Sequence, residues 1–460
     1  MSGLEISEYN LVDVLGNKDY RWDSNFYTTK ILYNKKLKYR PIGEVITKSQ
    51  YGISRSMNED KGIPIYRMNE IHNMLCDNYV DKFVEMTTDE FETFKLKDGD
   101  VLFNRTNSYQ FVGRTGIYYK KGTQDKVFAS YLVRFNTDKN TILPEYLTVF
   151  LNTKYGLLDI RRRSRPSINQ TNVNPEEVKE ILIPILSMEL QERIARYIKK
   201  ADDLIYESER LYTLAEQILL DEIGLIDFNP TESNVSIKRF TDSFLESGRL
   251  DAEYYQPKYD YIFEKLIYKK RVVSLNIYDK NYVPQDDKKY KYIELANIRE
   301  NGIIDDVETY EGIDLPTRAR RKIKEGQVLV SSIEGSLSSC ALVTKDFNGA
   351  ICTNGFYVVD ADEINSETLL VLIKSWLIQE VLKRECSGTI LTSINKADFS
   401  RIRLPMVDAV TQKDIKKMIV ESYNLRQRSK ILLEKATKSV EIAIECGEKT
   451  AIEFLKEEKV

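Results

Sequence analysis

The chain has 460 residues, 42% hydrophobic and 30% charged, a composition typical of a globular protein large enough for two hydrophobic cores. Its formal net charge of -3 weighs against a protein that coats nucleic acid without sequence selection, because such proteins need a strongly positive surface. No stretch approaches the roughly 18 apolar residues of a membrane span, and the amino terminus lacks the basic and apolar segments of a secretory signal. We therefore expect a cytoplasmic protein without a membrane partner.

The residue patterns of common active sites are missing. Five cysteines are dispersed without a C-x-x-C pair, and the single histidine, His72, has no second histidine with which to build a zinc site. The sequence also lacks a Walker A loop, a Gly-x-Gly-x-x-Gly loop and the Asn-Pro-Pro-aromatic segment of adenine methyltransferases. These absences predict a binding protein with no catalytic residue, metal or cofactor of its own.

The sequence repeats itself at an offset of roughly 225 residues. Residues 21–27 (RWDSNFY) recur as residues 249–255 (RLDAEYY). Four further landmarks follow in the same order: residues 66–71 with 293–298, 97–102 with 324–329, 167–169 (Ser-Ile-Asn) with 393–395, and 181–184 with 402–405. A period this long indicates a duplicated domain, which suits a target with two related halves.

Each half begins with strands and continues with a helix. Residues 30–137 alternate short β-branched and aromatic runs with Gly, Asn and Asp, which predicts strands and loops. Residues 144–162 then show the apolar spacing of a helix. The second half repeats this order, with strands near 327–332, 340–344 and 356–359 and a helix over 366–384. Both halves are therefore expected to be mixed α/β (α+β) domains.

A long helix is predicted after each half, because apolar and small residues recur alternately every four and three residues. The second seam matches the first at a displacement of 221 residues, from Ile194 to Ile415. The first contains Leu190, Ile194, Tyr197, Ala201, Leu204, Ser208, Leu211, Ala215 and Ile218, and the second contains Ile415, Met418, Ser422, Leu425, Ser429, Leu432 and Ala436. Small residues at matching positions predict that the two helices pack closely on each other; the alternative is that each packs on its own domain.

These patterns divide the chain into five segments. They are a first domain (1–184), a central helix (185–225), a turn-rich linker (226–240), a second domain (241–405) and a C-terminal helix (406–460).

Three stretches carry a resemblance to a known family. They are the run from Lys97 to Arg105 with Val112-Gly113-Arg114 after it, Ser167-Ile168-Asn169, and residues 181–194 (ILIPILSMELQERI). Together with the duplication they resemble the specificity subunit of type I restriction-modification enzymes. The second half departs from the pattern, since Gln327 replaces the Asp of Gly-Asp and residues 331–334 replace residues 103–106.

The resemblance implies two duplicated target-recognition domains separated by two long antiparallel coiled-coil helices, with each domain reading one half of a split site in double-stranded DNA. It also implies partner chains. A pair of methyltransferase subunits would dock on the helices and methylate adenine with S-adenosylmethionine, and motor-nuclease subunits would use ATP and Mg.

Within that picture, polar and basic side chains of both halves are the candidate DNA contacts, because such groups pair with base edges and phosphates. In the first half they are Arg67, Asn69, Asn104, Arg105, Thr106, Asn107, Ser108, Arg114, Arg161, Arg163 and Asn169. In the second half they are Ser331, Ser332, Glu334, Ser336, Ser393, Asn395 and Lys396. We expect the loop 104–108 to read bases and Arg163 to bind phosphate; the alternative is an ordinary polar loop.

Two other functional classes stay open at this stage. One is a bifunctional restriction-methylation enzyme whose catalytic motif is not recognised in the sequence. The other is a scaffold whose duplicated domains bind proteins. Binding of S-adenosylmethionine by the isolated chain would favour the enzyme, and tight binding to partners without DNA selectivity would favour the scaffold.

Overall fold

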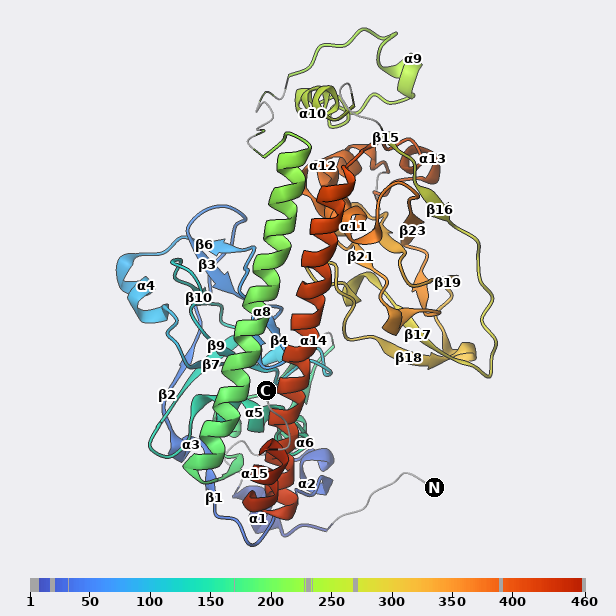
Figure 1. The fold of residues 1–460 in the computed structure, drawn as a ribbon. Coiled ribbons are helices and arrows are strands. Elements are labelled where there is room, and N and C mark those ends of the chain that lie inside the picture. Colours follow the sequence, from blue (N-terminus) through green and yellow to red (C-terminus); the bar gives the residue numbers. More distant parts are fainter. Residues whose placement is uncertain are drawn as a thin grey trace. The chain divides into compact units, whose positions relative to one another are not determined.

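Two long helices organise the chain, and each begins in one structural unit and ends in the other. The computed structural model describes residues 8–16, 21–31, 33–168, 170–226, 228, 233, 235–267, 272–388 and 392–456. Unit 1 consists of Met1–Tyr206 with Leu425–Val460, and unit 2 of Glu207–Asn424. Helix α8 (Met188–Glu222) leaves unit 1 for unit 2, and α14 (Ala409–Cys446) returns (Figure 1). Among the described helices, none combines the length and apolar character that crossing a membrane needs.

Unit 1 is a mixed α/β domain built around a six-stranded sheet in the order β2-β11-β7-β9-β5-β4. Smaller sheets have the orders β10-β3-β6, β12-β13-β8 and β1-β14. The strands are β1 (Tyr39–Pro41), β2 (Ile46–Tyr51), β3 (Ile63–Tyr66), β4 (Ile71–His72), β5 (Leu75–Cys76), β6 (Phe83–Val84), β7 (Asp100–Asn104), β8 (Thr106–Asn107), β9 (Thr115–Tyr118), β10 (Val127–Phe128), β11 (Leu132–Thr137), β12 (Arg165–Pro166), β13 (Thr171–Asn172) and β14 (Leu182–Pro184). The helices besides α8 and α14 are α1 (Leu11–Leu15), α2 (Ser24–Thr28), α3 (Ile42–Val45), α4 (Thr88–Phe94), α5 (Pro144–Asn152), α6 (Lys154–Arg163), α7 (Pro175–Lys179) and α15 (Glu448–Lys456).

Unit 2 has the same mixed character, with two four-stranded sheets in the orders β16-β23-β20-β21 and β18-β17-β22-β19 and the pair β15-β24. Its strands are β15 (Val272–Val273), β16 (Asn276–Tyr278), β17 (Lys289–Ile293), β18 (Glu308–Glu311), β19 (Ala319–Lys322), β20 (Val328–Ser331), β21 (Ala341–Leu342), β22 (Ile351–Thr353), β23 (Phe356–Asp360) and β24 (Leu404–Pro405). The α-helices are α9 (Phe244–Ser247), α10 (Pro257–Ile267), α11 (Ser366–Lys374), α12 (Trp376–Glu385) and α13 (Lys396–Phe399), with 3-10 turns η1 (Leu295–Asn297), η2 (Gly312–Asp314), η3 (Glu334–Ser336) and η4 (Lys345–Phe347). The expected mixed α/β character of both halves is confirmed.

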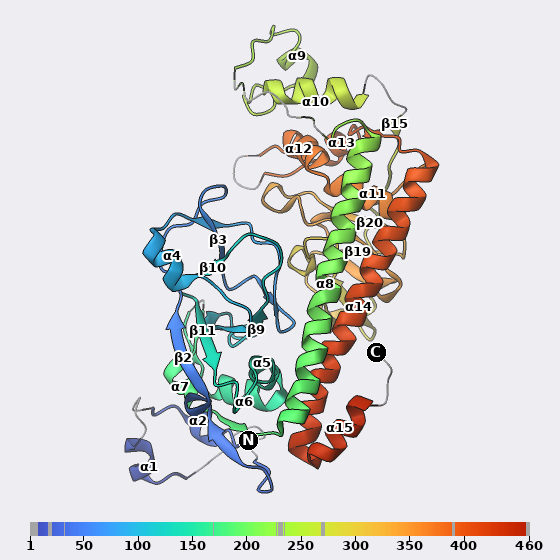
Figure 2. The same cartoon turned by 60° about the vertical axis from the view of Figure 1, so that its left-hand side comes forward.

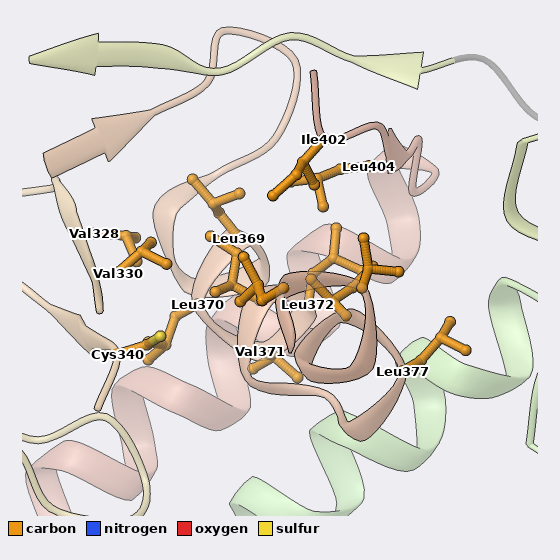
Figure 3. Close-up of a cluster of buried hydrophobic side chains, with 14 of the residues drawn as sticks. Val328, Val330, Cys340, Leu369, Leu370, Val371, Leu372, Leu377, Ile402 and Leu404 are labelled. Carbon is orange, nitrogen blue, oxygen red and sulfur yellow. The ribbon is translucent and has the colours of Figure 1, made fainter. Parts of the chain in front are cut away.

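The largest core of unit 2 forms where α11 covers β20. Figure 3 shows Val328 and Val330 of β20 in one cluster with Leu369, Leu370 and Leu372 of α11, and Ile402 and Leu404 join them. Leu369, Leu370 and Leu372 are fully buried. Each such side chain contributes about 1.5–3 kcal/mol relative to an exposed one. The same core includes Tyr212 and Leu219 of α8 and Ile415 and Ile419 of α14, so the long helices are part of the domain they leave.

Each helix expected after the strands is in fact two helices, broken at a buried hydroxyl residue. In unit 1, Thr153 separates α5 from α6 with an extended backbone, and its Oγ1 lies 2.7 Å from the carbonyl oxygen of Phe150. In unit 2, Ser375 separates α11 from α12, and its Oγ donates to the carbonyl oxygen of Leu372 at 2.6 Å. A side-chain hydroxyl that bonds the preceding turn competes with the helical ladder, which accounts for both breaks.

The turn before the central strand is built alike in both units. Asp100 accepts a hydrogen bond from the backbone N–H of Lys97 at 2.9 Å, and Gln327 accepts one from the backbone N–H of Lys324 at 2.8 Å. Between each pair stands a glycine at positive φ, Gly99 at 85° and Gly326 at 84°, a conformation that favours glycine. Gln327 therefore replaces the aspartate of the first half without altering the turn.

The two long helices pack directly on each other within each unit (Figures 1 and 2). In unit 2 the hydroxyls of Ser208 and Ser422 are 2.8 Å apart, and Ser422 also donates to the carbonyl oxygen of Ser208 at 3.0 Å. In unit 1 Ser429 donates to the carbonyl oxygen of Ala201 at 2.9 Å. Side chain to backbone bonds between helices require close approach, so the predicted antiparallel helix pair is confirmed.

The seam positions are not buried equally. Leu190, Ile194, Tyr197, Leu204, Leu425, Leu432 and Ile415 are buried. Leu211, Ile218 and Met418 of unit 2 are only half-buried, whereas their neighbours Tyr212 and Leu219 are buried in the core of the domain. The helices thus pack both on each other and on their domain, which combines the two arrangements left open by the sequence.

A bulky side chain in the seam should separate the helices. We expect Ser429→Leu to lower the free energy of unfolding by about 1–3 kcal/mol, the usual effect of overpacking a close contact. The neighbouring Lys430 is exposed on the same helix, so Lys430→Leu is the matched control and should change stability little. Chemical denaturation of the full chain measures both; equal stability of the two variants would contradict close packing at this position.

Candidate nucleic-acid interface

In unit 1 the predicted base-reading loop joins β7 to the short strand β8, and two of its five residues hold the loop together. Asn104 is fully buried; its Nδ2 donates to the carbonyl oxygen of Met68 at 3.2 Å, and its Oδ1 accepts from the backbone N–H of Thr106 at 3.3 Å. Thr106 is also buried, and its hydroxyl bonds Asn172 at 2.6 Å. These positions favour a structural role for both residues over the expected contact with bases.

The other residues of the loop reach the surface. Arg105 is half-buried, and its guanidinium lies over the ring of Tyr51 with 5.3 Å to the ring centre. Asn107 is half-buried and Ser108 is exposed, with the side chain of Asn107 accepting from the backbone N–H of Ser108 at 2.8 Å. Arginine, asparagine and serine groups at a surface can donate to and accept from base edges, so this part of the loop keeps the chemistry expected of it.

A second segment, 66 residues further along the chain at Asn172, pairs with the loop. Strand β13 is antiparallel to β8, with Thr171 opposite Asn107 and Asn172 opposite Thr106, and β12 completes a three-stranded sheet. The backbone N–H of Val173 donates to the carbonyl oxygen of Arg105 at 2.9 Å. The structure thus brings the loop and the region of Ser167 together, although the sequence gave no sign of this pairing.

Unit 2 repeats the arrangement with different side chains. The buried Ser331 takes the place of Asn104, since its hydroxyl accepts from the backbone N–H of Ile333 at 3.2 Å. Ile333 pairs with Ser393, and the backbone N–H of Ile394 donates to the carbonyl oxygen of Ser332 at 2.8 Å. The carboxylate of Glu334 accepts from the hydroxyl of Thr392, and the Ser336 hydroxyl is 3.3 Å from that of Ser331. Ser331, Ser332 and Glu334 are therefore engaged within the loop, with Ser332 bonded to the carbonyl oxygen of Gly355.

These hydrogen bonds correct one sequence equivalence. Val173 and Ile394 occupy the same place, which corresponds to a displacement of 221 residues, as in the helix seam. Asn174 and Asn395 each cap a short helix, α7 and α13, by accepting from a backbone N–H. The match of Ser167-Ile168-Asn169 to residues 393–395 is therefore wrong. Asn395 caps a helix, Lys396 is paired with Asp279, and Asn169 lies outside the described residues.

The remaining basic candidates differ widely in their surroundings. Arg67 is held by the carboxylates of Glu70 and Asp81, and the half-buried Arg114 stacks on the ring of Phe111 at 3.9 Å. Asn69 and Arg161 are exposed.

Arg163 is buried, with its guanidinium 3.0 Å from the Asp159 carboxylate and 3.2 Å from that of Glu180. This burial and pairing favour a structural role over the predicted contact with phosphate.

The aromatic signature of each half anchors the segment that leads to β12 or its counterpart. Arg21 is buried and donates to the carbonyl oxygen of Arg163 at 2.8 Å and to the Glu177 carboxylate at 3.1 Å. Arg249 likewise donates to the carbonyl oxygens of Arg384 and Cys386, at 3.3 and 2.8 Å. Both arginines thereby satisfy acceptors at the end of a helix, which otherwise lack partners.

An aspartate two residues after each signature arginine completes the clasp. Arg21 bonds Asp23 at 2.7 Å and Arg249 bonds Asp251 at 2.6 Å. The hydrogen bond from Arg249 lowers the pKa of Asp251. Burial alone would raise the pKa of Asp23, but the hydrogen bond and charge of Arg21 outweigh it and the pKa falls. Both carboxylates are therefore ionised at neutral pH and fix the arginines in place.

Exposed tyrosines beside the loop were not predicted from the sequence. Tyr51 lies under Arg105, Tyr131 accepts the backbone N–H of Arg105 with its carbonyl oxygen, and Tyr109 follows Ser108. Their exposed fractions are 46%, 41% and 52%. Exposed aromatic rings can stack on bases. Only Tyr109 had a usable sequence signal, its position next to the loop.

No cluster of three metal-ligating side chains occurs in the part of the chain that the structure describes. This is a statement about the described side chains alone.

The chain is similar to known specificity proteins. Residues 34–217 match the family "Type I restriction modification DNA specificity domain". The putative type I restriction enzyme MjaX specificity subunit of Methanocaldococcus jannaschii is 27% identical over 168 residues, which are 36% of this chain and 39% of that protein. The type I restriction enzyme EcoKI specificity subunit of Escherichia coli K12 is 27% identical over 168 residues, 36% of this chain and 35% of that protein. The aligned stretch is thus less than two-fifths of either relative.

Two solved structures have a related description. An S subunit of a type I restriction-modification system from M. genitalium is 13% identical, with 93% of this chain and 98% of that chain covered and a TM-score of 0.37. The HsdS subunit of Thermoanaerobacter tengcongensis is 11% identical, with 90% and 98% covered and a TM-score of 0.30. On the specificity domain over residues 34–217 and the two sequence relatives, the chain belongs to the specificity subunits of type I restriction-modification systems.

Proposed function

We propose that the chain reads a split site in double-stranded DNA, with one half-site read by each unit. The observation that carries this proposal is the repeated pairing of a loop after the central strand with a second segment, β8 with β13 in unit 1 and Ile333 with Ser393 in unit 2. The backbone bonds are the same, but the side chains differ. A common frame with different surface groups suits two domains that read different base sequences.

We further propose that the chain catalyses no reaction and directs other subunits to the site. A pair of methyltransferase subunits would transfer a methyl group from S-adenosylmethionine to adenine, and motor-nuclease subunits would use ATP and Mg to cleave DNA. Support comes from the membership in the specificity-subunit family and from the absence of catalytic and cofactor motifs in the sequence. Cofactors would then bind on the partner chains.

The two long helices would set the distance between the half-sites. Helix α8 has 35 residues and α14 has 38, so at about 1.5 Å per residue they are about 52 and 57 Å long. Since one turn of DNA is about 34–36 Å, helices of this length are compatible with half-sites about one turn apart. We therefore infer a bipartite site with an unread spacer of fixed length.

The test of this function compares the chain alone with the chain in complex. The purified chain should neither methylate nor cut DNA, and in cells with its cognate methyltransferase, mapping of methylated adenine should show a two-part site. Methyl transfer or S-adenosylmethionine binding by the isolated chain would contradict the proposal and favour an enzyme. Tight binding to partners without DNA selection would favour a scaffold.

Two arginines of α6 separate a DNA contact from a structural one. Arg161 is exposed, so Arg161→Ala should weaken binding to all sequences alike and reduce the slope of log affinity against log salt by about 1. Arg163→Ala should instead lower the free energy of unfolding by about 2 kcal/mol, because it removes charged hydrogen bonds from the buried Asp159. Salt titrations of DNA binding and denaturation curves of both variants distinguish the two roles. An unchanged salt slope for Arg161→Ala, or full stability of Arg163→Ala, would contradict the assignment concerned.

A longer helix pair should lengthen the spacer. One heptad is added to each helix, between Ala201 and Ser208 in α8 and between Ser422 and Ser429 in α14, so that the seam stays in register. Seven residues add about 10 Å, or about three base pairs. A heptad in α8 alone is the control and should impair assembly, because its seam residues lack partners. Methylation mapping would refute the inference if an active variant kept the original spacer or changed its half-sites.

A further inference from the structure

The hairpin of β12 and β13 carries an isoleucine at its tip that is almost completely exposed. Ile168 is 98% exposed, and its neighbours Arg165, Ser167 and Gln170 are exposed polar residues. Full burial of an isoleucine stabilises by about 1.5–3 kcal/mol, so this side chain contributes nothing of that kind to the folded unit. A single exposed apolar residue is common on surfaces, and it is the setting of Ile168 that points to a ligand.

The fold does not require an apolar residue at the tip. The position that fills the core below the hairpin is Val173, which is 1% exposed, and its counterpart in unit 2 is Ile394 at 2%. Both donate a backbone hydrogen bond to the loop after the central strand. Substitution of Ile168 therefore leaves the core of unit 1 intact.

The hairpin is held firmly from its base. The backbone N–H of Ser167 donates to the carbonyl oxygen of Gln170 at 2.7 Å and closes the turn. Arg165 pairs in register with Asn172, and its guanidinium is 2.8 Å from the buried carboxylate of Glu177. β13 is bonded on its other side to β8. These contacts present Ile168 on a braced support.

The surroundings of the tip suit nucleic acid. Arg161 is exposed at the end of α6, four residues before Arg165. On the neighbouring strand are Asn107 and, directly after it, Ser108 and the exposed Tyr109. Guanidinium groups bind phosphates and amide groups bind base edges, so an apolar tip stands among polar groups that would hold it against a duplex.

We propose that Ile168 is a wedge that inserts between stacked base pairs in the half-site read by unit 1. The inference rests on the DNA binding proposed above. The interior of the base stack is an apolar environment, and isoleucine is among the side chains that enter it; the cost of unstacking is offset by contacts that the kinked duplex gains. The kink produced by such wedges is about 20–90°. The segment of unit 2 displaced by 221 residues begins at Thr389, outside the described residues, so the proposal concerns unit 1 alone.

The experiment measures DNA shape with the full chain. Duplexes selected by the wild-type protein from a random library carry a dye at each end, so that energy transfer reports bending. 2-Aminopurine at each position in turn reports unstacking. Ile168→Ser should abolish the bend and the 2-aminopurine signal and weaken binding at least about 10-fold, the equivalent of about 1.4 kcal/mol. Ile168→Leu should retain both signals, because it keeps an apolar side chain.

The matched control is Ile237→Ser, which removes an isoleucine that is 93% exposed in the segment before the second domain. It should bend and bind DNA like the wild type. An unchanged bend in Ile168→Ser overturns the wedge. A straight duplex whose binding by the wild type weakens when thymine is replaced by uracil also overturns it, in favour of contact with a thymine methyl group. If the wild type selects no DNA at all, the proposed function itself fails, which separates that outcome from failure of the wedge alone.

Discussion

The close approach of small side chains between α8 and α14 is the contact on which both units depend. In unit 2, Ser422 donates to a backbone carbonyl oxygen of α8, and in unit 1, Ser429 does the same. Bonds of this kind form only where no larger side chain intervenes. Because residues of both helices belong to the core that packs on α11 and β20, separating the helices would also open that core. The small residues of the seam are therefore a condition for the packing of the domain.

Local patterns in the sequence predicted the regular elements well. The seam spacing gave α8 and α14, since a heptad repeat depends only on neighbouring turns of one helix. The break of the helix at Thr153 was not predicted, because a hydroxyl can end a helix or bond within it without change in the apolar pattern. The equivalence of Ser167-Ile168-Asn169 with residues 393–395 was wrong because three identical letters outweighed the displacement of 221 residues that the seam had already indicated.

The candidate interface was only partly predictable. The polar composition of residues 104–108 identified the right loop, but it did not reveal that Asn104 and Thr106 turn inward while Arg105 and Ser108 face the surface. The burial of Arg163 depends on Asp159 and Glu180 being brought to it by α6 and the end of α7. The pairing of β8 with β13 is made by strands of two residues each, too short to give a periodic signal. Non-local contacts of this kind follow from the fold and not from any window of the sequence.

The division of the chain between its units has a consequence for its synthesis. Unit 2 is one continuous stretch, Glu207–Asn424, whereas unit 1 combines Met1–Tyr206 with Leu425–Val460. At about 5–20 residues per second, a ribosome needs on the order of tens of seconds to make the intervening stretch. During that time the bond from Ser429 to Ala201 cannot form, and the α8 face of unit 1 has no helix to cover it. The half of the protein that is translated first is thus the last to be completed.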